Sequence, residues 1–200
     1  GQKCSAASRA YIPASLWQKV KEGLLKEIED IKMGDIKDFR NLMGAVIDKA
    51  SYDNIVNYIK YAQASKDAEV LATGYDDSVG YFVAPTLIEA KTPDFKCLLE
   101  EIFGPVLAII RAKDFDDALE IANNTEYGLT GAVYTRNRTK LAKAKSEFHV
   151  GNLYLNRKCT GALVGVQPFG GFNMSGTDSK AGGTDYLLLF TQAKSIAEKL

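Results

Sequence analysis

Residues 100–110 read EEIFGPVLAII, and this stretch sets the expected fold. Its second half, residues 106–110, is apolar at every position and lacks the alternation of a strand that faces water on one side. A strand of that kind is covered on both faces, which is typical of parallel sheets. We therefore expect this strand near the centre of a sheet.

Helices and strands alternate on both sides of this stretch. Helical spacing of apolar residues appears in the ranges 13–33, 49–62, 115–122 and 139–148. Ser15 and Gln18 predict a capping box for the first helix, and Asp48 and Asp114 predict caps for the second and third. Runs typical of strands lie between the helices, at 69–72, 81–88, 106–110, 131–134 and 150–155. The sequence thus predicts an α/β fold with a largely parallel open sheet flanked by helices.

Composition narrows the classes of function. The chain has 200 residues, 46% of them apolar, and its 25 Lys and Arg balance its 25 Asp and Glu. A zero net charge offers no basic field for nucleic acid or an anionic membrane. Three separated cysteines and one histidine argue against a disulfide scaffold and a zinc site. We expect a protein of the cytoplasm, or of the mitochondrial matrix in a eukaryote, with no metal and no nucleic-acid or membrane partner.

Two segments near the C-terminus depart from the α/β pattern. Residues 161–183 are rich in glycine and have neither helical nor strand periodicity, so they predict a long structured loop with a functional role. Residues 191–196 are typical of an exposed strand, which invites pairing with another chain. We therefore predict one domain at 1–185 and an oligomerisation segment at 186–200.

Cys4 is the first candidate for chemistry. It lies in the small-residue segment GQKCSAA at 1–7, where backbone amides can approach whatever binds the sulfur and a substrate has room. The alternative is a buried, inert thiol, because reactivity requires exposure and thiolate character. The segment lacks a start methionine, so we expect a piece of a longer protein.

Other catalytic devices fail on spacing or composition. Four residues separate Cys4 from Arg9, which is one short of a phosphatase loop. Gly171 and Gly176 have the spacing of a phosphate-binding loop, but a Thr-Asp pair follows where Lys and Ser or Thr are required. A Ser/His or Cys/His device could use only His149, which we interpret as structural.

Glu101 and Phe103 form the second candidate. In an extended segment a carboxylate and a ring two residues apart share one face. Glu101 can then accept hydrogen bonds from sugar hydroxyls while Phe103 packs on the same ligand. The alternative is a solvated acidic helix end followed by a phenylalanine of the core.

Together these segments resemble the aldehyde dehydrogenase superfamily in order and spacing. The motifs are GQKCSA at 1–6, EIFGP at 101–105, NNTEYGL at 123–129, PFGG at 168–171 and SG at 175–176. The resemblance covers essentially the whole chain, corresponds to the half of the enzyme that begins at the catalytic cysteine, and implies the α/β fold of that catalytic domain. Residues 157–183 more narrowly resemble members that oxidise L-glutamate 5-semialdehyde, formed from 1-pyrroline-5-carboxylate, to glutamate in proline degradation.

The resemblance implies roles for the first candidates. Cys4 matches the nucleophile, which adds to the aldehyde carbon as a thiohemiacetal and, after hydride transfer to NAD, holds a thioester that water hydrolyses. Its backbone N–H matches one donor to the oxyanion. Glu101 matches the carboxylate that holds the nicotinamide ribose, and Phe103 matches the ring packed beside it.

The resemblance also implies a substrate site. Ser5, Gly161 and Ala162 match the anchor of the substrate α-carboxylate, where a hydroxyl and two backbone N–H groups receive an anion. Phe169 matches the aromatic wall beside the aliphatic chain. No chemical role is expected for Cys97 or Cys159.

Several elements of the family have no match in these 200 residues. The general-base glutamate, an asparagine oxyanion donor and the dinucleotide-binding domain lie upstream of the cysteine. We therefore expect this chain to be inactive alone, to need that cofactor domain as a partner, and to belong to a homo-oligomer. Two alternatives stay open: an aldehyde dehydrogenase for a different aldehyde, and a non-catalytic scaffold that kept the fold.

Overall fold

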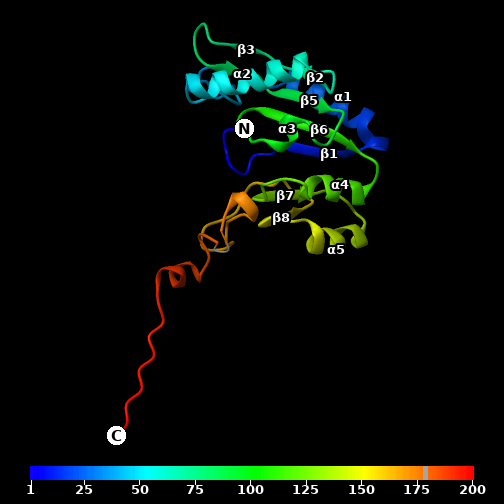
Figure 1. Cartoon of the computed structure of the whole chain (residues 1–200). Coiled ribbons are helices and arrows are strands. Elements are labelled where there is room, and N and C mark those ends of the chain that lie inside the picture. Colours follow the sequence, from blue (N-terminus) through cyan, green and yellow to red (C-terminus); the bar gives the residue numbers. More distant parts are fainter. Residues whose placement is uncertain (178–179) are drawn as a thin grey trace. The chain divides into compact units, whose positions relative to one another are not determined.

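The computed structural model describes residues 1–177 and 180–200 and divides the chain into two units, Gly1–Thr125 and Glu126–Leu200 (Figure 1). Each unit has its own parallel strands and its own helices. The predicted boundary after residue 185 concerns subunit assembly and stays a prediction. None of the helices in the described residues is both long enough and apolar enough to cross a membrane.

A four-stranded sheet forms the centre of the first unit. It consists of β1 (Arg9–Pro13), β2 (Ala68–Ala72), β5 (Thr86–Ala90) and β6 (Val106–Ala112), in the order β1-β6-β5-β2. Strand β6 runs parallel to both of its neighbours, and β2 pairs antiparallel with β5. The predicted α/β class and the interior position of residues 106–110 are confirmed. Strand β1 was not predicted.

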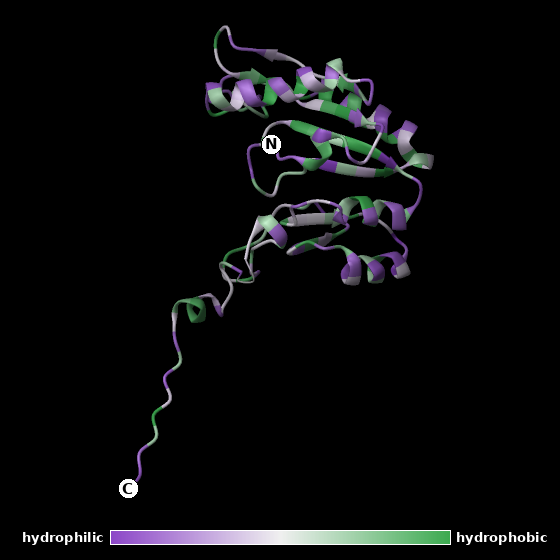
Figure 2. Ribbon diagram, in the orientation of Figure 1, coloured by the Kyte–Doolittle hydropathy of each residue, from purple (hydrophilic) through white to green (hydrophobic). Residues whose placement is uncertain are grey.

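Strand β6 is covered on both faces, which explains its unbroken apolar sequence. Val106, Ala108 and Ile110 pack in one cluster with residues of helix α2 (Lys49–Ala64). Ile109, between them, packs in a second cluster with Trp17 of helix α1 (Trp17–Glu29). Figure 2 shows the middle strands of this unit coloured as hydrophobic. Since successive side chains point to opposite faces, both faces require apolar residues.

The caps predicted at Asp48 and Asp114 are confirmed, and the one predicted at Ser15 is not. Asp48 caps α2 by accepting a hydrogen bond from Ser51 N–H at 2.8 Å. Asp114 caps helix α4 (Phe115–Asn123) by accepting two backbone hydrogen bonds at 2.9 Å. The capping box at Ser15 is wrong, because Ser15 lies in a 3-10 turn, η1 (Ala14–Leu16), and α1 begins after Leu16 without a side-chain cap.

The strand predicted at 81–88 is divided in the structure. Phe82–Val83 forms β4, which pairs antiparallel with β3 (Tyr75–Asp76), and β5 begins only at Thr86. Pro85 lies at the break, and proline has no N–H to donate to a strand ladder. The periodicity of the run was strand-like throughout, so the proline was the missed signal.

One charged side chain is buried in this sheet. Glu89 of β5 is only 4% exposed. Arg111 Nε of β6 lies 2.8 Å from one of its carboxylate oxygens, and Lys21 Nζ of α1 lies 4.0 Å from the other. Such pairing offsets the cost of burying a carboxylate.

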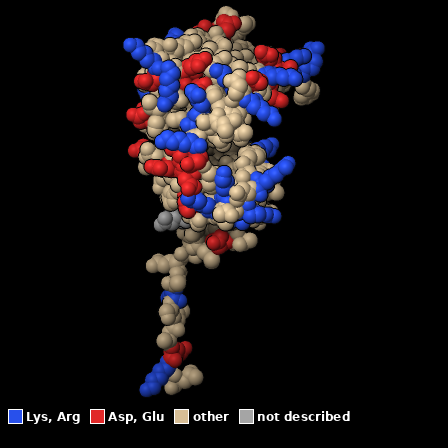
Figure 3. Space-filling model, turned by 90° about the vertical axis from the view of Figure 1, so that its right-hand side faces the viewer, with Lys and Arg blue, Asp and Glu red and all other residues tan. Residues whose placement is uncertain are grey.

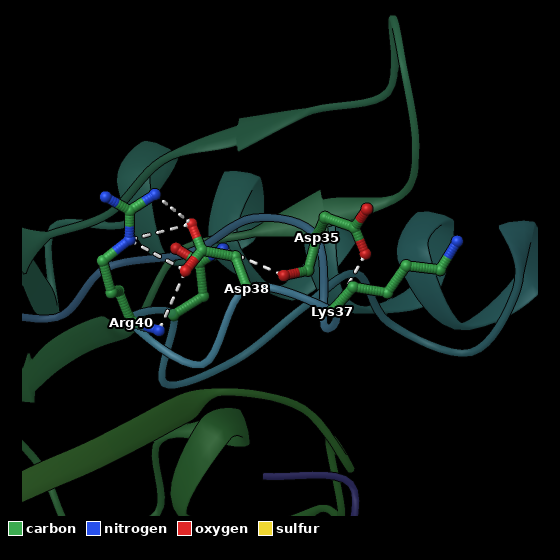
Figure 4. A network of polar contacts seen from close by, with 5 residues as sticks. Asp35, Lys37, Asp38 and Arg40 are labelled. Atoms are coloured by element: carbon green, nitrogen blue, oxygen red, sulfur yellow. Dashed lines mark hydrogen bonds and ion pairs between the residues drawn. The ribbon is translucent and has the colours of Figure 1, made fainter.

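Residues 32–47 form an ordered loop before α2. Met33 and Met43 pair as an isolated bridge, and Leu42 N–H donates to the Lys32 carbonyl at 2.8 Å. Asp38 accepts three hydrogen bonds from the Arg40 guanidinium, at 2.9, 3.2 and 2.7 Å (Figure 4). These bonds lower the pKa of Asp38 and raise that of Arg40.

The second unit contains one βαβ element. Strand β7 (Thr130–Val133) and strand β8 (Asn152–Leu155) pair in parallel, and helix α5 (Arg138–Glu147) connects them. Asn137 caps α5 by accepting hydrogen bonds from Thr139 and Lys140 N–H.

After β8 the second unit continues as a loop with two short 3-10 helices, η2 (Asn173–Ser175) and η3 (Tyr186–Phe190). The strand predicted at 191–196 is not formed, since these residues are exposed and carry no ladder partner among the described residues. A strand here needs a partner from outside this chain.

The surface carries both signs of charge. On the face drawn in Figure 3, basic and acidic side chains are interspersed. This agrees with the equal numbers of basic and acidic residues in the sequence. Mixed charge of this kind provides little attraction for a polyanion.

Candidate active site

Cys4 lies at the outside of a tight turn. Lys3 N–H donates to the Gly1 carbonyl, and Ala6 N–H donates to the Lys3 carbonyl, both at 2.9 Å. The turn leaves Cys4 exposed, while the next residue, Ser5, is only 4% exposed. The alternative of a buried, inert thiol is therefore wrong for this structure.

Two contacts fix this turn to the rest of the first unit. Gln2 Oε1 accepts a hydrogen bond from Ile47 N–H at 2.9 Å. A Cβ atom on Gly1 would lie 2.0 Å from the Gly104 carbonyl oxygen, so the two backbones are in direct contact. The candidate nucleophile is thus held against the second candidate segment. Sequence reasoning missed Gln2 as an anchor, although it stands inside the quoted motif.

The second candidate segment is a strained turn. Phe103 has a φ of 55°, in the left-handed region that bulky residues rarely adopt. It is 43% exposed, and Ile102 beside it is 5% exposed. The expected extended backbone is wrong at Phe103, and so is the alternative of a core phenylalanine, because Ile102 takes the place in the core. Glu101 is exposed. Strain of this kind clusters at ligand sites.

Helix α2 packs against this turn. Asn54 Nδ2 donates to the Ile102 carbonyl at 3.3 Å. Ile55 is fully buried, and a Cβ atom on Gly104 would lie 2.5 Å from its side chain. A side chain at position 104 would have to displace Ile55. Helix α2 therefore supports the turn that carries Phe103, and that turn in turn contacts the Cys4 turn through Gly104 and Gly1.

The other two cysteines differ from Cys4 in environment. Cys97, in helix α3 (Lys96–Leu99), is 2% exposed, and burial raises the pKa of its thiol to about 11. Cys159 is partly exposed. The packing role predicted for Cys97 agrees with this burial.

We expect iodoacetamide at pH 8 to modify Cys4 well before Cys97. Thiolates are the reactive form, and a thiol with a pKa of about 11 is almost fully protonated at that pH. Because folding raises the pKa of Cys97, its contribution to stability is present below pH 9 and is lost between about pH 9 and 11. Peptide mapping by mass spectrometry measures the order of labelling. Modification of Cys97 first would contradict the burial described here.

The second unit contains the remaining predicted residues. Gly161 has a φ of 116°, which favours glycine, and Ala162 next to it is partly buried. Phe169 forms an antiparallel bridge with Ala181, with hydrogen bonds of 2.8 and 2.9 Å between the two backbones. Its side chain lines a hollow of about 480 Å³ together with residues of η3, including Phe190.

The glycine-rich loop packs backbone against backbone. A Cβ atom on Gly151 would lie 1.8 Å from the Gly170 carbonyl oxygen, and one on Gly171 would lie 2.5 Å from Ser175 Cβ. Ser175 Oγ also accepts a hydrogen bond from Gly128 N–H at 3.0 Å. The loop predicted at 161–183 is structured over its described residues, 161–177 and 180–183, while 178–179 lie outside the described residues. Its glycines allow this close approach.

The position of His149 agrees with the structural role predicted for it. The His149 ring packs against Phe172 with 4.6 Å between ring centroids, as for a structural histidine. Within residues 1–177 and 180–200, no group of three or more His, Cys, Asp or Glu is arranged to hold a metal ion.

Comparison with known proteins places these residues in a family. Residues 1–196 match the model of the aldehyde dehydrogenase family. The chain is 55% identical over 199 residues to a 1-pyrroline-5-carboxylate dehydrogenase of Geobacillus sp. (strain WCH70) and 53% identical over 199 residues to one of Bacillus subtilis (strain 168). Each alignment covers 99% of this chain and 38% of the relative, so the chain spans well under half of their length.

Solved structures agree with the sequence relatives. A 1-pyrroline-5-carboxylate dehydrogenase from Thermus with bound NAD matches all of this chain and 38% of its own, with a TM-score of 0.94 and 46% identity. A betaine aldehyde dehydrogenase from Staphylococcus aureus in complex with NAD+ matches 94% of this chain and 38% of its own, with a TM-score of 0.87 and 27% identity. Because a family model covers residues 1–196 and relatives share more than half of their aligned residues with it, this chain belongs to the aldehyde dehydrogenase family.

Proposed function

We propose that this chain carries the catalytic cysteine of an NAD-dependent aldehyde dehydrogenase that oxidises L-glutamate 5-semialdehyde to glutamate in proline degradation. The main support is the exposed Cys4 turn in direct backbone contact with the turn that presents Glu101 and Phe103. Relatives more than 50% identical are named 1-pyrroline-5-carboxylate dehydrogenase, which favours this substrate over other aldehydes.

Cys4 is the proposed nucleophile. Its thiolate sulfur adds to the aldehyde carbon and forms a C–S bond, and the carbonyl oxygen becomes an oxyanion. The Cys4 N–H is the proposed donor to that oxyanion, a contribution of about 3 kcal/mol in comparable enzymes. After the carbon loses its hydride, Cys4 holds a thioester, and water releases the carboxylic acid and restores the thiol.

Glu101 and Phe103 are the proposed cofactor contacts. An exposed carboxylate accepts hydrogen bonds from ribose hydroxyls, and an exposed ring packs against a planar ligand. Both groups extend from a turn that touches the cysteine turn, so these residues fit a nicotinamide dinucleotide. When bound, that cofactor supplies the hydride acceptor.

The substrate anchor stays a prediction from the family. It assigns Ser5, Gly161 and Ala162 to the α-carboxylate and Phe169 to the aliphatic chain. Backbone N–H groups at a glycine with positive φ are suited to receiving an anion, which supports Gly161 and Ala162.

The proposal also covers the activity of these residues alone, the oligomeric state and the cellular location. These 200 residues alone are proposed to be inactive, because the family's general base and dinucleotide-binding domain have no match among them. The exposed leucines and Phe190 of η3 support an oligomer formed through residues 186–200. The bacterial origin of the relatives supports a cytoplasmic location.

Aldehyde selectivity tests the proposed substrate. In the protein expressed from its complete reading frame, kcat/KM for L-glutamate 5-semialdehyde should exceed that for pentanal, an uncharged aldehyde of equal chain length, by at least about 100-fold. The reason is that a site with donors for a carboxylate leaves them unpaired with pentanal. NADH absorbance measures both rates.

The outcomes separate the alternatives. Equal values of kcat/KM for the two aldehydes would exclude the carboxylate anchor and favour an aldehyde dehydrogenase of another substrate. The absence of NADH formation with any aldehyde would favour a scaffold that kept the fold.

A further inference from the structure

One side chain holds the backbone on both sides of Phe169. Asn152 Nδ2 donates to the Pro168 carbonyl at 2.9 Å, and Asn152 Oδ1 accepts from Gly170 N–H at 3.2 Å. The amide therefore uses its donor and its acceptor on the two peptide groups that flank Phe169. The Pro168 carbonyl accepts a hydrogen bond and Gly170 N–H donates one, so only one orientation of the Asn152 amide satisfies both partners.

Asn152 stands on a rigid element. It is the first residue of β8, it pairs with Thr130 of β7, and its own N–H donates to the Leu129 carbonyl at 3.0 Å. Residues placed on strands hold a site more precisely than residues placed on loops. The amide thus ties the glycine-rich loop to the parallel strands of the second unit.

The remaining contacts of Phe169 explain what the amide adds. The bridge to Ala181 holds Phe169 from the other side, but Ala181 belongs to the same long loop. Gly151, next to β8, also packs against Gly170, and Phe172 N–H donates to the Gly128 carbonyl at 3.0 Å. Without Asn152 these contacts remain, but the two peptide groups beside Phe169 lose their side-chain hydrogen bonds to β8.

We propose that Asn152 is a positioning residue that fixes the Phe169 ring and thereby sets the preference among aldehydes. The inference rests on the proposed function, in which Phe169 forms the wall beside the aliphatic part of the substrate. Asn152 acts through Phe169 and does not touch the reacting atoms. Its loss moves the wall but leaves Cys4 and the cofactor contacts, which belong to the first unit, unaltered.

Three variants test this in the protein expressed from its complete reading frame. Asn152→Ala removes both hydrogen bonds, and Asn152→Asp keeps an acceptor for Gly170 N–H but loses the donor to the Pro168 carbonyl. Asn137→Ala is the matched control, because it also removes two side-chain to backbone hydrogen bonds in the second unit, at the cap of α5. If Asn152 only stabilised the fold, Asn152→Ala and Asn137→Ala would change KM for the aldehyde to the same extent.

Asn152→Ala should lower kcat/KM for L-glutamate 5-semialdehyde by about tenfold, mainly through KM, and leave KM for NAD unchanged. Asn152→Asp should lie between this variant and the unaltered protein, and Asn137→Ala should leave KM for the aldehyde unchanged. In a Phe169→Ala background, Asn152→Ala should have no further effect, because the two residues act through one wall.

Amide hydrogen exchange gives a readout that needs no activity. The N–H groups of Phe169 and Gly170 should exchange faster in Asn152→Ala than in Asn137→Ala. Full additivity of the Phe169 and Asn152 effects, or an equal rise in KM in both asparagine-to-alanine variants, would overturn the inference. If the unaltered protein oxidised no aldehyde, the proposed function would fail, and unchanged exchange at Phe169 and Gly170 would separately overturn the positioning role.

Discussion

Replacing Cys4 with alanine is expected to lower kcat for aldehyde oxidation by at least about 1,000-fold, the scale seen when a covalent nucleophile is removed. No other cysteine can take over its role in the first unit. Cys97 is 2% exposed, and its thiol has a pKa of about 11. NADH formation by the protein expressed from its complete reading frame measures the effect.

Two controls give this result its meaning. Cys159→Ser changes a partly exposed thiol without an assigned role and should leave kcat nearly unaltered. The Cys4 variant should still bind NAD, because Glu101 and Phe103 are intact. A Cys4→Ala protein with more than a tenth of the original kcat would show that another group attacks the aldehyde.

Replacing Gly151 with alanine is expected to cost about 3 kcal/mol or more of the free energy of unfolding, since the added methyl group overpacks a closed site. That methyl would lie 1.8 Å from the Gly170 carbonyl oxygen and 2.7 Å from Gly171 Cα. Both obstacles are backbone atoms, so no side-chain rotation relieves the clash. Urea unfolding followed by circular dichroism measures the loss.

Gly23→Ala is the matched control for this substitution. Gly23 lies inside helix α1, and a Cβ atom there meets nothing within 4 Å. Alanine in an exposed helix is favoured over glycine by about 0.5 to 1 kcal/mol, so this variant should be slightly more stable. Equal stability of the two alanine variants would contradict the close approach of Gly151 and Gly170.

The α/β class was predictable because its signal is local. Residues 106–110 are apolar without alternation, and this required burial on both faces before any partner was known. The caps at Asp48 and Asp114 were predictable for the same reason, since a cap depends on residues within one turn. Ser15 and Gln18 show that such a local pattern does not always mark a helix start, because Ser15 lies in a 3-10 turn.

The candidate site was predictable only in part. Cys4, Glu101 and Phe103 stand in motifs that a sequence displays, and the resemblance assigned their roles. The anchors Gln2 and Asn152 were missed, because their partners lie 45 and 16 residues away. The spacing of residues within one motif cannot indicate a hydrogen bond to a residue so far away in the sequence.

The sequence by itself determined the alternation of helices and strands, the central strand and the family, because these follow from short-range periodicity and from contiguous motifs. Three features were decided only by the tertiary structure: the left-handed backbone of Phe103, the backbone contact of Gly1 with Gly104, and the backbone contact of Gly151 with Gly170. These features arise where segments distant in the chain exclude each other's atoms. Steric contact of that kind is a property of packing and leaves no periodic trace in the residues that make it.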